Sequence, residues 1–121
     1  IIRTNMADHL IAHCEIPTTD LNKSKEFYHK VLGWDFKPFG YDYLLFNNHK
    51  GTMVGLRKVD EVIQGNSTVF HVNIPDIDSI LKRAKENGGA VKRTKTVIPA
   101  MGWYALFNDP DGNTIGLYQK S

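Results

Sequence analysis

Two short segments carry the side chains best suited to chemistry. HCEIP at His13–Pro17 and HVNIP at His71–Pro75 each place a histidine two residues before a second polar residue, Glu15 or Asn73. Imidazole and carboxylate groups bind divalent metal ions, and a carboxylate can also act as a general base. The same groups could instead contact a polar ligand without a metal, or pair with one another in a wet cavity.

The alternation of polar and apolar residues indicates where these side chains point. Successive side chains on a strand face opposite sides, so His13 and Glu15 share one face. His71 and Asn73 likewise share a face, opposite the apolar Val72. The apolar sides should pack on helices, and the polar sides are then expected to line a concave inner surface. A polar group buried there without a partner would cost about 1–3 kcal/mol.

The chain repeats itself. The segment YLLFNNHKGTMVGL at Tyr43–Leu56 reappears as YALFNDPDGNTIGL at Tyr104–Leu117, an offset of 61 residues. The two histidine segments match each other at an offset of 58 residues. The two halves of the chain are therefore expected to share one architecture.

A helical pattern follows each histidine segment. In the first half Asp20 is a favourable N-cap and Gly33 ends the run, and in the second half Gly88 and Gly89 end it. Apolar and small residues recur at helical spacing in both. The two stripes are Leu21, Ser24, Phe27, Tyr28, Val31 and Leu32, then Ile77, Ile80, Leu81 and Ala84.

Three strand-like stretches follow each predicted helix. They are 34–37, 43–46 and 52–57 in the first half, and 90–94, 103–107 and 113–119 in the second. The last two stretches of the second half are joined by Asp109-Pro110-Asp111-Gly112, which has the residues that a type I turn favours. Each half is therefore predicted to run strand–helix–strand–strand–strand.

These elements predict an α+β fold built from two tandem βαβββ modules. A single module has a helix on only one face of its sheet. Two modules side by side can form a curved mixed sheet with a central cavity and the helices on the outer face. We expect residues 1–121 to form one domain, with module one at about 8–60 and module two at about 66–120.

The composition is that of a globular protein. The chain has 121 residues, of which 41% are hydrophobic, and this length can bury a core. The formal net charge is +2 and the basic residues are scattered, which argues against nucleic-acid binding. Cys14 is the single cysteine, as is common in reducing compartments, and no apolar run approaches the roughly 18 residues of a membrane span. A cytoplasmic protein without a membrane partner is predicted.

Two longer motifs, KEFYHKVLGW at 25–34 and FNDPDGNTIGL at 107–117, resemble the vicinal oxygen chelate superfamily. The duplication of the βαβββ pattern and the histidine on the first strand add to this resemblance, which runs from about Leu10 to Lys120. The superfamily includes glyoxalase I, extradiol dioxygenases, fosfomycin-modifying enzymes and bleomycin-resistance proteins. Its metal enzymes and its metal-free binding proteins share one fold.

For the metal enzymes, the resemblance implies four ligands, one on the first and last strand of each half. His13 falls on the first position, while the two carboxylate positions fall on Gly55 and Gly116, which cannot ligate. The remaining position is Val69 when counted back from the second helix, or His71 when the repeat is followed. The standard metal set is therefore incomplete. The two glycines either enlarge the cavity or permit a bulge or a close approach of strands.

More side chains are expected on the inner face. Arg57 could hold an anionic group of a ligand, and Tyr118 or Trp103 could stack on a flat one; exposure and ordinary packing are the alternatives. The apolar segment 97–102 is a loop over the cavity mouth or at a dimer contact. The predicted cavity residues are His13, Glu15, Met53, Gly55, Arg57, Val69, His71, Asn73, Trp103, Gly116 and Tyr118.

The sequence thus predicts a glyoxalase/bleomycin-resistance-like protein that binds a small organic molecule between its modules without the standard metal set. One alternative is a metal-dependent lyase or isomerase of glyoxalase type. Its catalytic groups would be His13, Glu15 and His71, with zinc, nickel or a similar ion held by the two histidines. A second alternative is a non-catalytic interaction module. Because the family often dimerises, a homodimer is expected.

Overall fold

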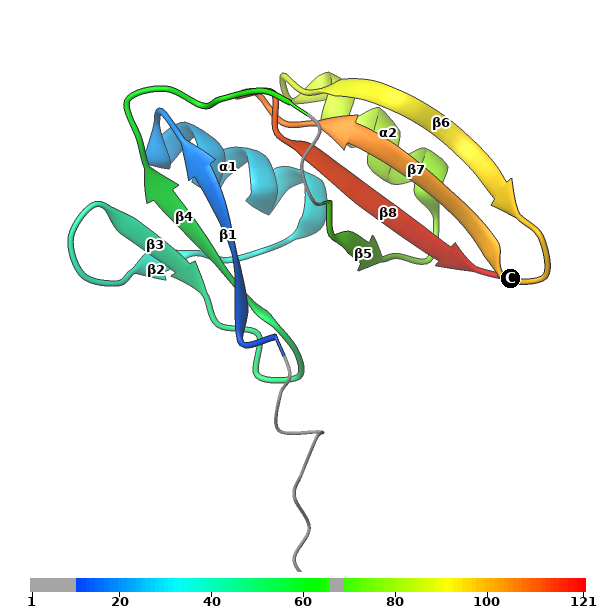
Figure 1. Ribbon diagram of the computed structural model, residues 1–121, viewed down its shortest axis with the longest axis horizontal. Helices are drawn as coiled ribbons and strands as arrows, with labels where there is room; N and C mark the ends of the chain where they lie inside the picture. Colours follow the sequence, from blue (N-terminus) through cyan, green and yellow to red (C-terminus); the bar gives the residue numbers. More distant parts are fainter. Residues whose placement is uncertain (1–10, 66–68) are drawn as a thin grey trace, which may run out of the picture.

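The computed structural model describes residues 11–65 and 69–121 and has two similar halves (Figure 1). Each half contains one helix and a four-stranded mixed sheet. The predicted α+β fold of two βαβββ modules is confirmed. The sheets remain two separate layers and do not close into one continuous curved sheet.

The first module begins with β1 (His13–Thr18) and α1 (Leu21–Leu32). Its other strands are β2 (Lys37–Pro38), β3 (Tyr43–Phe46) and β4 (Met53–Lys58), and the sheet order is β1-β4-β3-β2. Strand β1 runs parallel to β4, and the remaining pairs are antiparallel.

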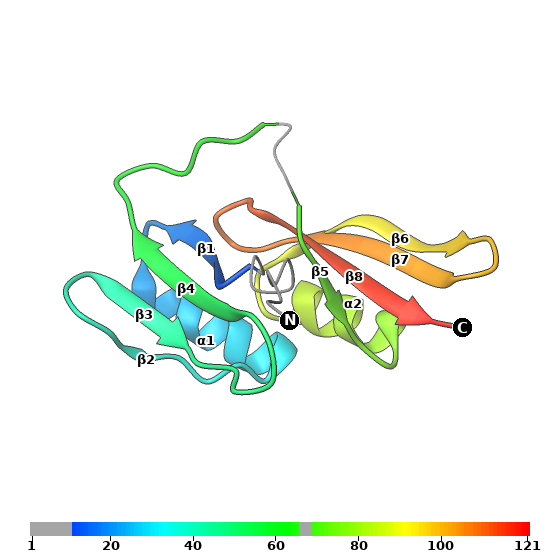
Figure 2. The same ribbon diagram turned by 60° about the horizontal axis from the view of Figure 1, so that its bottom comes forward.

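The second module repeats this plan with β5 (His71–Asn73) and α2 (Ile77–Glu86). Strands β6 (Ala90–Ile98), β7 (Gly102–Asn108) and β8 (Thr114–Lys120) complete a sheet with the order β5-β8-β7-β6. The edge strands β1 and β5 lie toward the middle of the molecule in both ribbon views (Figures 1 and 2), and both helices lie behind the sheets in Figure 1. The polar side chains of these edge strands, His13 and Glu15 on β1 and His71 and Asn73 on β5, are exposed.

The core lies between the helices and the sheets. From α1 it contains Phe27, Tyr28 and Val31, all nearly inaccessible to solvent. Trp34 stacks between Tyr28 and Phe46, with ring centroids 5.7 and 5.5 Å apart. This packing explains why residues 34–36 do not form the predicted strand and β2 begins only at Lys37. No helix in the part of the chain that the structure describes is long and apolar enough to cross a membrane.

The two helix N-termini offer a matched pair of N-cap variants. The Asp20 carboxylate accepts a hydrogen bond from the Lys23 amide at 3.0 Å, whereas the Asp76 side chain makes no such bond at the start of α2. Asp20→Ala is expected to lower the free energy of unfolding by about 1 kcal/mol, and Asp76→Ala by clearly less. Urea unfolding of both variants tests this difference, and equal losses would contradict it.

Candidate functional site

The face of the first sheet away from α1 carries a cluster of three polar side chains. The Arg57 Nε donates to Glu15 Oε1 at 2.6 Å, and this ion pair links neighbouring strands, since Glu15 pairs with Gly55 and Pro17 with Arg57. Tyr43, on the next strand, has its pKa raised, first by burial and then by its hydrogen bond to Glu15. The cluster keeps Glu15 bound to a cation and leaves part of the Arg57 guanidinium for other contacts.

Gly55 on β4 lies directly beneath the Tyr43 side chain of this cluster. A Cβ atom at Gly55 would overlap the hydroxyl and ring of Tyr43, so the aromatic side chain lies directly on the backbone of β4. The alternatives predicted for this glycine were more cavity volume, or a bulge or close strand approach. The structure instead brings a side chain, Tyr43, against it. The Tyr43 ring, rather than open cavity, fills the space above Gly55.

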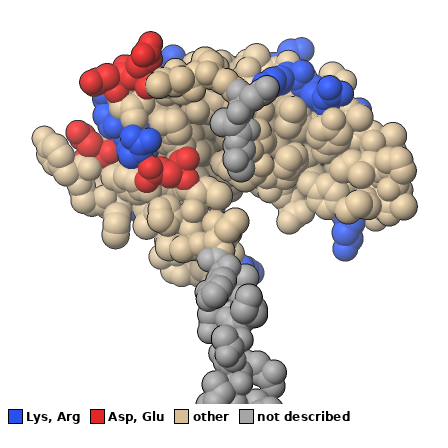
Figure 3. Space-filling view, viewed as in Figure 1, with Lys and Arg blue, Asp and Glu red and all other residues tan. Residues whose placement is uncertain are grey.

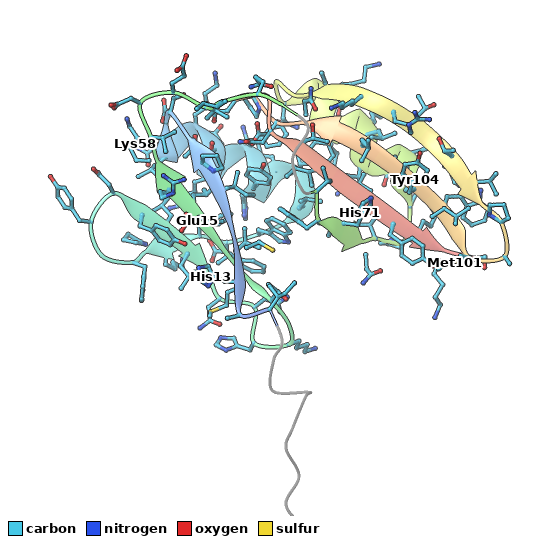
Figure 4. All side chains as sticks on the ribbon, in the orientation of Figure 1. His13, Glu15, Lys58, His71, Met101 and Tyr104 are labelled. Atoms are coloured by element: carbon cyan, nitrogen blue, oxygen red, sulfur yellow. The ribbon has the colours of Figure 1, made fainter. Side chains whose placement is uncertain are left out.

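The second sheet has an equivalent arrangement with different residues. A Cβ at Gly116 would overlap the His71 ring, so this imidazole covers β8 as Tyr43 covers β4. The His71 and Tyr104 ring centroids lie 6.4 Å apart, and the Arg93 guanidinium lies 5.9 Å from the Tyr104 centroid. Figure 4 shows His71 and Tyr104 on this sheet, and His13 and Glu15 on the other. The two polar faces are therefore separate surfaces.

Tyr104 was missed by the sequence interpretation, although the signal was present. In the internal repeat it occupies the position of Tyr43. In the structure it pairs with Tyr118 across β7 and β8, while the Tyr118 hydroxyl donates to the Met101 carbonyl at 2.7 Å. Tyr118 thus helps to hold the β6–β7 turn, in addition to its position on the sheet face.

Trp103 lies on the opposite face from its predicted place. It pairs with Gln119, on the side of β8 that also carries Leu117, and packs against the hydrophobic core. The Lys95 ammonium lies 4.5 Å from the centroid of its ring. A side-chain period of two explains the difference, because Tyr104 rather than Trp103 shares the face of Tyr118.

The pairing of strands resolves the register that the sequence left open. Glu15 pairs with Gly55, and His71 pairs with Gly116, so His71 is the equivalent of Glu15. Val69 is then the equivalent of His13, in agreement with the count back from the helix and not with the histidine repeat.

The four positions implied for a metal therefore hold His13, Gly55, Val69 and Gly116. Only His13 has a ligating side chain, whereas a catalytic zinc site usually has three protein ligands. Among the described residues, no three His, Cys, Asp or Glu side chains come together in a way that could hold a metal ion. These residues do not fit the metal of the enzyme branch.

A cavity of about 550 Å³ lies where the two modules meet. The first module contributes the end of β1, the second contributes parts of β6, β7 and β8, and the segment 62–65 between the modules forms a third wall. Of the predicted cavity residues only Glu15 lines it. The lining side chains also include Ile16, Val62, Ile63, Phe70, Lys92, Asn108, Thr114 and Ile115.

The segment between the modules is tied to the turn at 109–112. The Gln64 side chain donates to the Asp111 carbonyl at 2.8 Å and lies against Gly112, which adopts a φ of 87°. This contact places Val62 and Ile63 beside the cavity. Sequence reasoning missed this wall because a connection between modules carries no periodic pattern.

Asp111 joins the two modules from the same turn. Its carboxylate accepts hydrogen bonds from the hydroxyls of Thr18 and Thr19, each at 2.7 Å, and from Ser24 at 3.3 Å. Burial alone would raise the pKa of Asp111, but the hydrogen bonds outweigh it and lower the pKa. Asn113 adds a bond from its side-chain amide to the Pro17 carbonyl at 2.8 Å.

Asp109 reaches deeper into the interface. The Tyr28 hydroxyl of α1 donates to its carboxylate at 2.6 Å, and the backbone amides of Asp111 and Asn113 also donate to it. Burial raises the pKa of Asp109, although these hydrogen bonds act to lower it. The pKa of Tyr28 is also raised, first by burial and then by the nearby charge of Asp109. The sequence motif therefore forms both a turn and the contact between modules.

The lowered pKa of Asp111 predicts a pH-dependent contribution to stability. A carboxyl whose pKa falls on folding stabilises the protein above its unfolded pKa, and this contribution is lost as the pH falls through the folded value. Asp111→Asn should therefore lower the free energy of unfolding by about 1 kcal/mol at neutral pH, since solvent screens this partly exposed carboxylate, and the difference from wild type should shrink below about pH 4. Urea unfolding at both pH values measures it; a constant difference would contradict the assignment.

The fold consists of two paired βαβββ modules, each with a side-chain ring packed on a strand glycine. Comparison with known protein families identifies the family. Residues 10–117 match the Glyoxalase/Bleomycin resistance protein/Dioxygenase superfamily. The chain belongs to this superfamily, as the motifs predicted.

Individual relatives support the same assignment. A "Glyoxylase-like domain-containing protein" from Didymella fabae is 28% identical over 116 residues, covering 86% of this chain and 88% of that protein. The crystal structure of TnmS3, an antibiotic binding protein from Streptomyces sp. CB03234, is 29% identical with a TM-score of 0.73 and covers 97% of this chain and 100% of its own. A FosX fosfomycin resistance protein mutant from Listeria monocytogenes, complexed with Mn(II) and 1S,2S-dihydroxypropylphosphonic acid, shares the fold at 18% identity. Its TM-score is 0.77, over 93% of this chain and 91% of that chain.

Proposed function

We propose that this protein binds a small organic molecule in the cavity between its two modules, without the standard metal set. The main observation in support is the cavity of about 550 Å³ at the junction of the modules. Its volume lies within the range of small-molecule sites. The accessible walls are mostly polar, with apolar side chains among the lining residues. TnmS3, similar along almost the whole chain, is described as an antibiotic binding protein.

The same cavity argues against a purely structural interaction module. Such a module would be expected to fill the space between its halves with side chains. The enzymatic alternative, a glyoxalase-type lyase or isomerase using His13, Glu15 and His71, has less support. Glu15 is already bound to Arg57, and His13 and His71 are exposed on different sheets.

A thermal-shift screen of small aromatic and aliphatic compounds tests the proposal. A compound present at about 100 times its Kd should stabilise the protein by about 2.7 kcal/mol. Val62→Trp, which places a large ring beside the cavity, should abolish the shift. Val97→Trp adds the same ring at an exposed position outside the cavity and should leave the shift unchanged. Equal shifts in both variants would place binding elsewhere.

Metal titration separates the proposal from the enzymatic alternative. Since three of the four implied ligand positions lack ligating side chains, zinc, nickel and cobalt should bind weakly to the wild type. His13→Ala should then change little. The measurement is isothermal titration calorimetry together with the metal content of the purified protein. A stoichiometric metal that His13→Ala removes would contradict the metal-free account.

Homodimer formation and a cytoplasmic location also stay predictions. Large apolar side chains are exposed on the β2–β3 turn, at Phe39 and Tyr41, and around the β6–β7 turn, at Val97 of β6 and Met101. Contiguous exposed apolar surface marks protein–protein contacts, so each of these two groups is a candidate dimer contact. Sedimentation equilibrium measures it, and a monomer at all concentrations would exclude a dimer.

A further inference from the structure

We propose that the ligand of the junction cavity is a small organic acid, whose carboxylate is held by Lys92 and whose apolar body lies against Val62, Ile63 and Phe70. This inference rests on the proposed function, because it assumes that the cavity binds a ligand. It adds the chemical class of the ligand, and it makes Lys92 a residue that determines specificity.

The polar end of the cavity is a short chain of hydrogen bonds. Lys92 Nζ donates to Thr114 Oγ1 at 3.2 Å, and Thr114 Oγ1 donates to Asn108 Oδ1 at 3.1 Å. All three residues line the cavity. Because the Thr114 proton is directed to Asn108, the hydroxyl accepts from Lys92 and holds the ammonium of this exposed side chain near this end. An ammonium group has three donors, so two remain for a ligand.

The charge balance of the lining favours an anion. Glu15 is the acidic side chain among the lining residues, and the Arg57 guanidinium pairs with it at 2.6 Å. None of the three ion pairs among the described residues includes Lys92. On the face drawn in Figure 3, the charged side chains over the second module are basic. A carboxylate entering the cavity would therefore meet an ammonium group that no carboxylate already neutralises.

The apolar side chains beside this polar end can contact an apolar body on the ligand. Ile16 of β1 and Ile115 of β8 are buried behind the cavity, and Phe70 is half-buried. On the third wall Ile63 is 87% exposed, although it lines the cavity. Covering such a side chain with an apolar group removes hydrophobic surface from water. A fully polar anion such as inorganic phosphate would leave these walls uncovered.

Matched pairs of acids and amides test the role of charge. The probes are benzoate, 4-phenylbutyrate and 2-naphthylacetate, each beside its neutral primary amide, titrated by NMR at millimolar concentration. We expect the acid to bind about tenfold more tightly than its amide in the wild type, the effect of one charge-assisted hydrogen bond. Lys92→Met should remove this preference while the amide still binds. Lys95→Met, on the same strand but beside Trp103, should keep it.

The outcomes separate the inference from the proposed function. Equal affinity for acid and amide in the wild type, or an unchanged preference in Lys92→Met, would overturn the role of Lys92 and leave the cavity as a binding site. Failure of all six probes to bind, with no compound found in the thermal-shift screen, would overturn both. Inorganic phosphate serves as the control for simple charge attraction, and its binding as tightly as the acids would also contradict the proposed class.

Discussion

Asp109→Ala is expected to lower the free energy of unfolding by about 3 kcal/mol, because it removes a buried acceptor with several donors. The Tyr28 hydroxyl, on a side chain with no exposed surface, would lose its partner. A buried donor without an acceptor costs about 1–3 kcal/mol. The backbone amides of Asp111 and Asn113 would lose theirs as well. Urea unfolding of variant and wild type measures the loss.

Two further variants serve as comparisons for Asp109→Ala. Asp109→Asn keeps the shape and one acceptor, so it should cost less than Asp109→Ala. Asp60→Ala removes a carboxylate from an exposed position and should change stability by less than about 0.5 kcal/mol. If Asp109→Ala were as mild as Asp60→Ala, the turn at 109–112 would not be a principal contact between the modules.

Gly102→Ala is expected to lower the free energy of unfolding by about 2–5 kcal/mol, at least as much as Asp109→Ala. Two effects add at this position. Gly102 begins β7 with a φ of 140°, a backbone conformation that other residues rarely adopt. A Cβ there would also overlap the Gln119 carbonyl oxygen of the paired strand. Backbone strain contributes about 1–3 kcal/mol and forced overpacking a similar amount. Because the obstacle is backbone, no side chain can move aside.

Gly33→Ala is the matched control for the backbone part of this effect. Gly33 ends α1 with a φ of 75°, but a Cβ there would have no atom within 4 Å. Its replacement should therefore cost about 1 kcal/mol. Thermal or urea unfolding of both variants gives the comparison. Equal losses at the two positions would mean that the strand pair can open to accept the methyl group.

The parts of the fold that depend on local sequence could be predicted. Asp20 and Gly33 limit α1 as the capping pattern indicates, and the repeated segments form equivalent strands with the same neighbours. Both signals are local, because a cap or a strand period depends on a few consecutive residues. The identification of the family followed from the same local motifs.

The register of β5 could not be predicted, because two local signals disagreed. The repeat of the histidine segments equated His71 with His13, whereas the distance to the helix equated Val69 with His13. Pairing with β8, a contact between distant residues, decides between them. Trp103 was misplaced for a related reason, since one residue of uncertainty on a strand exchanges its two faces.

A cavity between the modules was predicted from the sequence, but most of the residues that line it were not. Its walls come from the end of β1, the starts of β6 and β8, and the segment around Val62. Hydrogen bonds of Asp109 and Asp111 hold the turn against the first module, and Gln64 ties the connecting segment to the same turn. The glycines could be read in two ways from sequence, and only the positions of Tyr43 and His71 show that side chains fill the space above them.

The most direct test of the account is a map of amide chemical-shift changes in the ¹⁵N-labelled protein titrated with 4-phenylbutyrate. If the ligand binds between the modules, the affected amides should come from both modules and surround the cavity, at Ile16, Ile63, Phe70, Lys92 and Ile115. Changes confined to one sheet face, such as that of His13 and Met53, would contradict a ligand site between the modules.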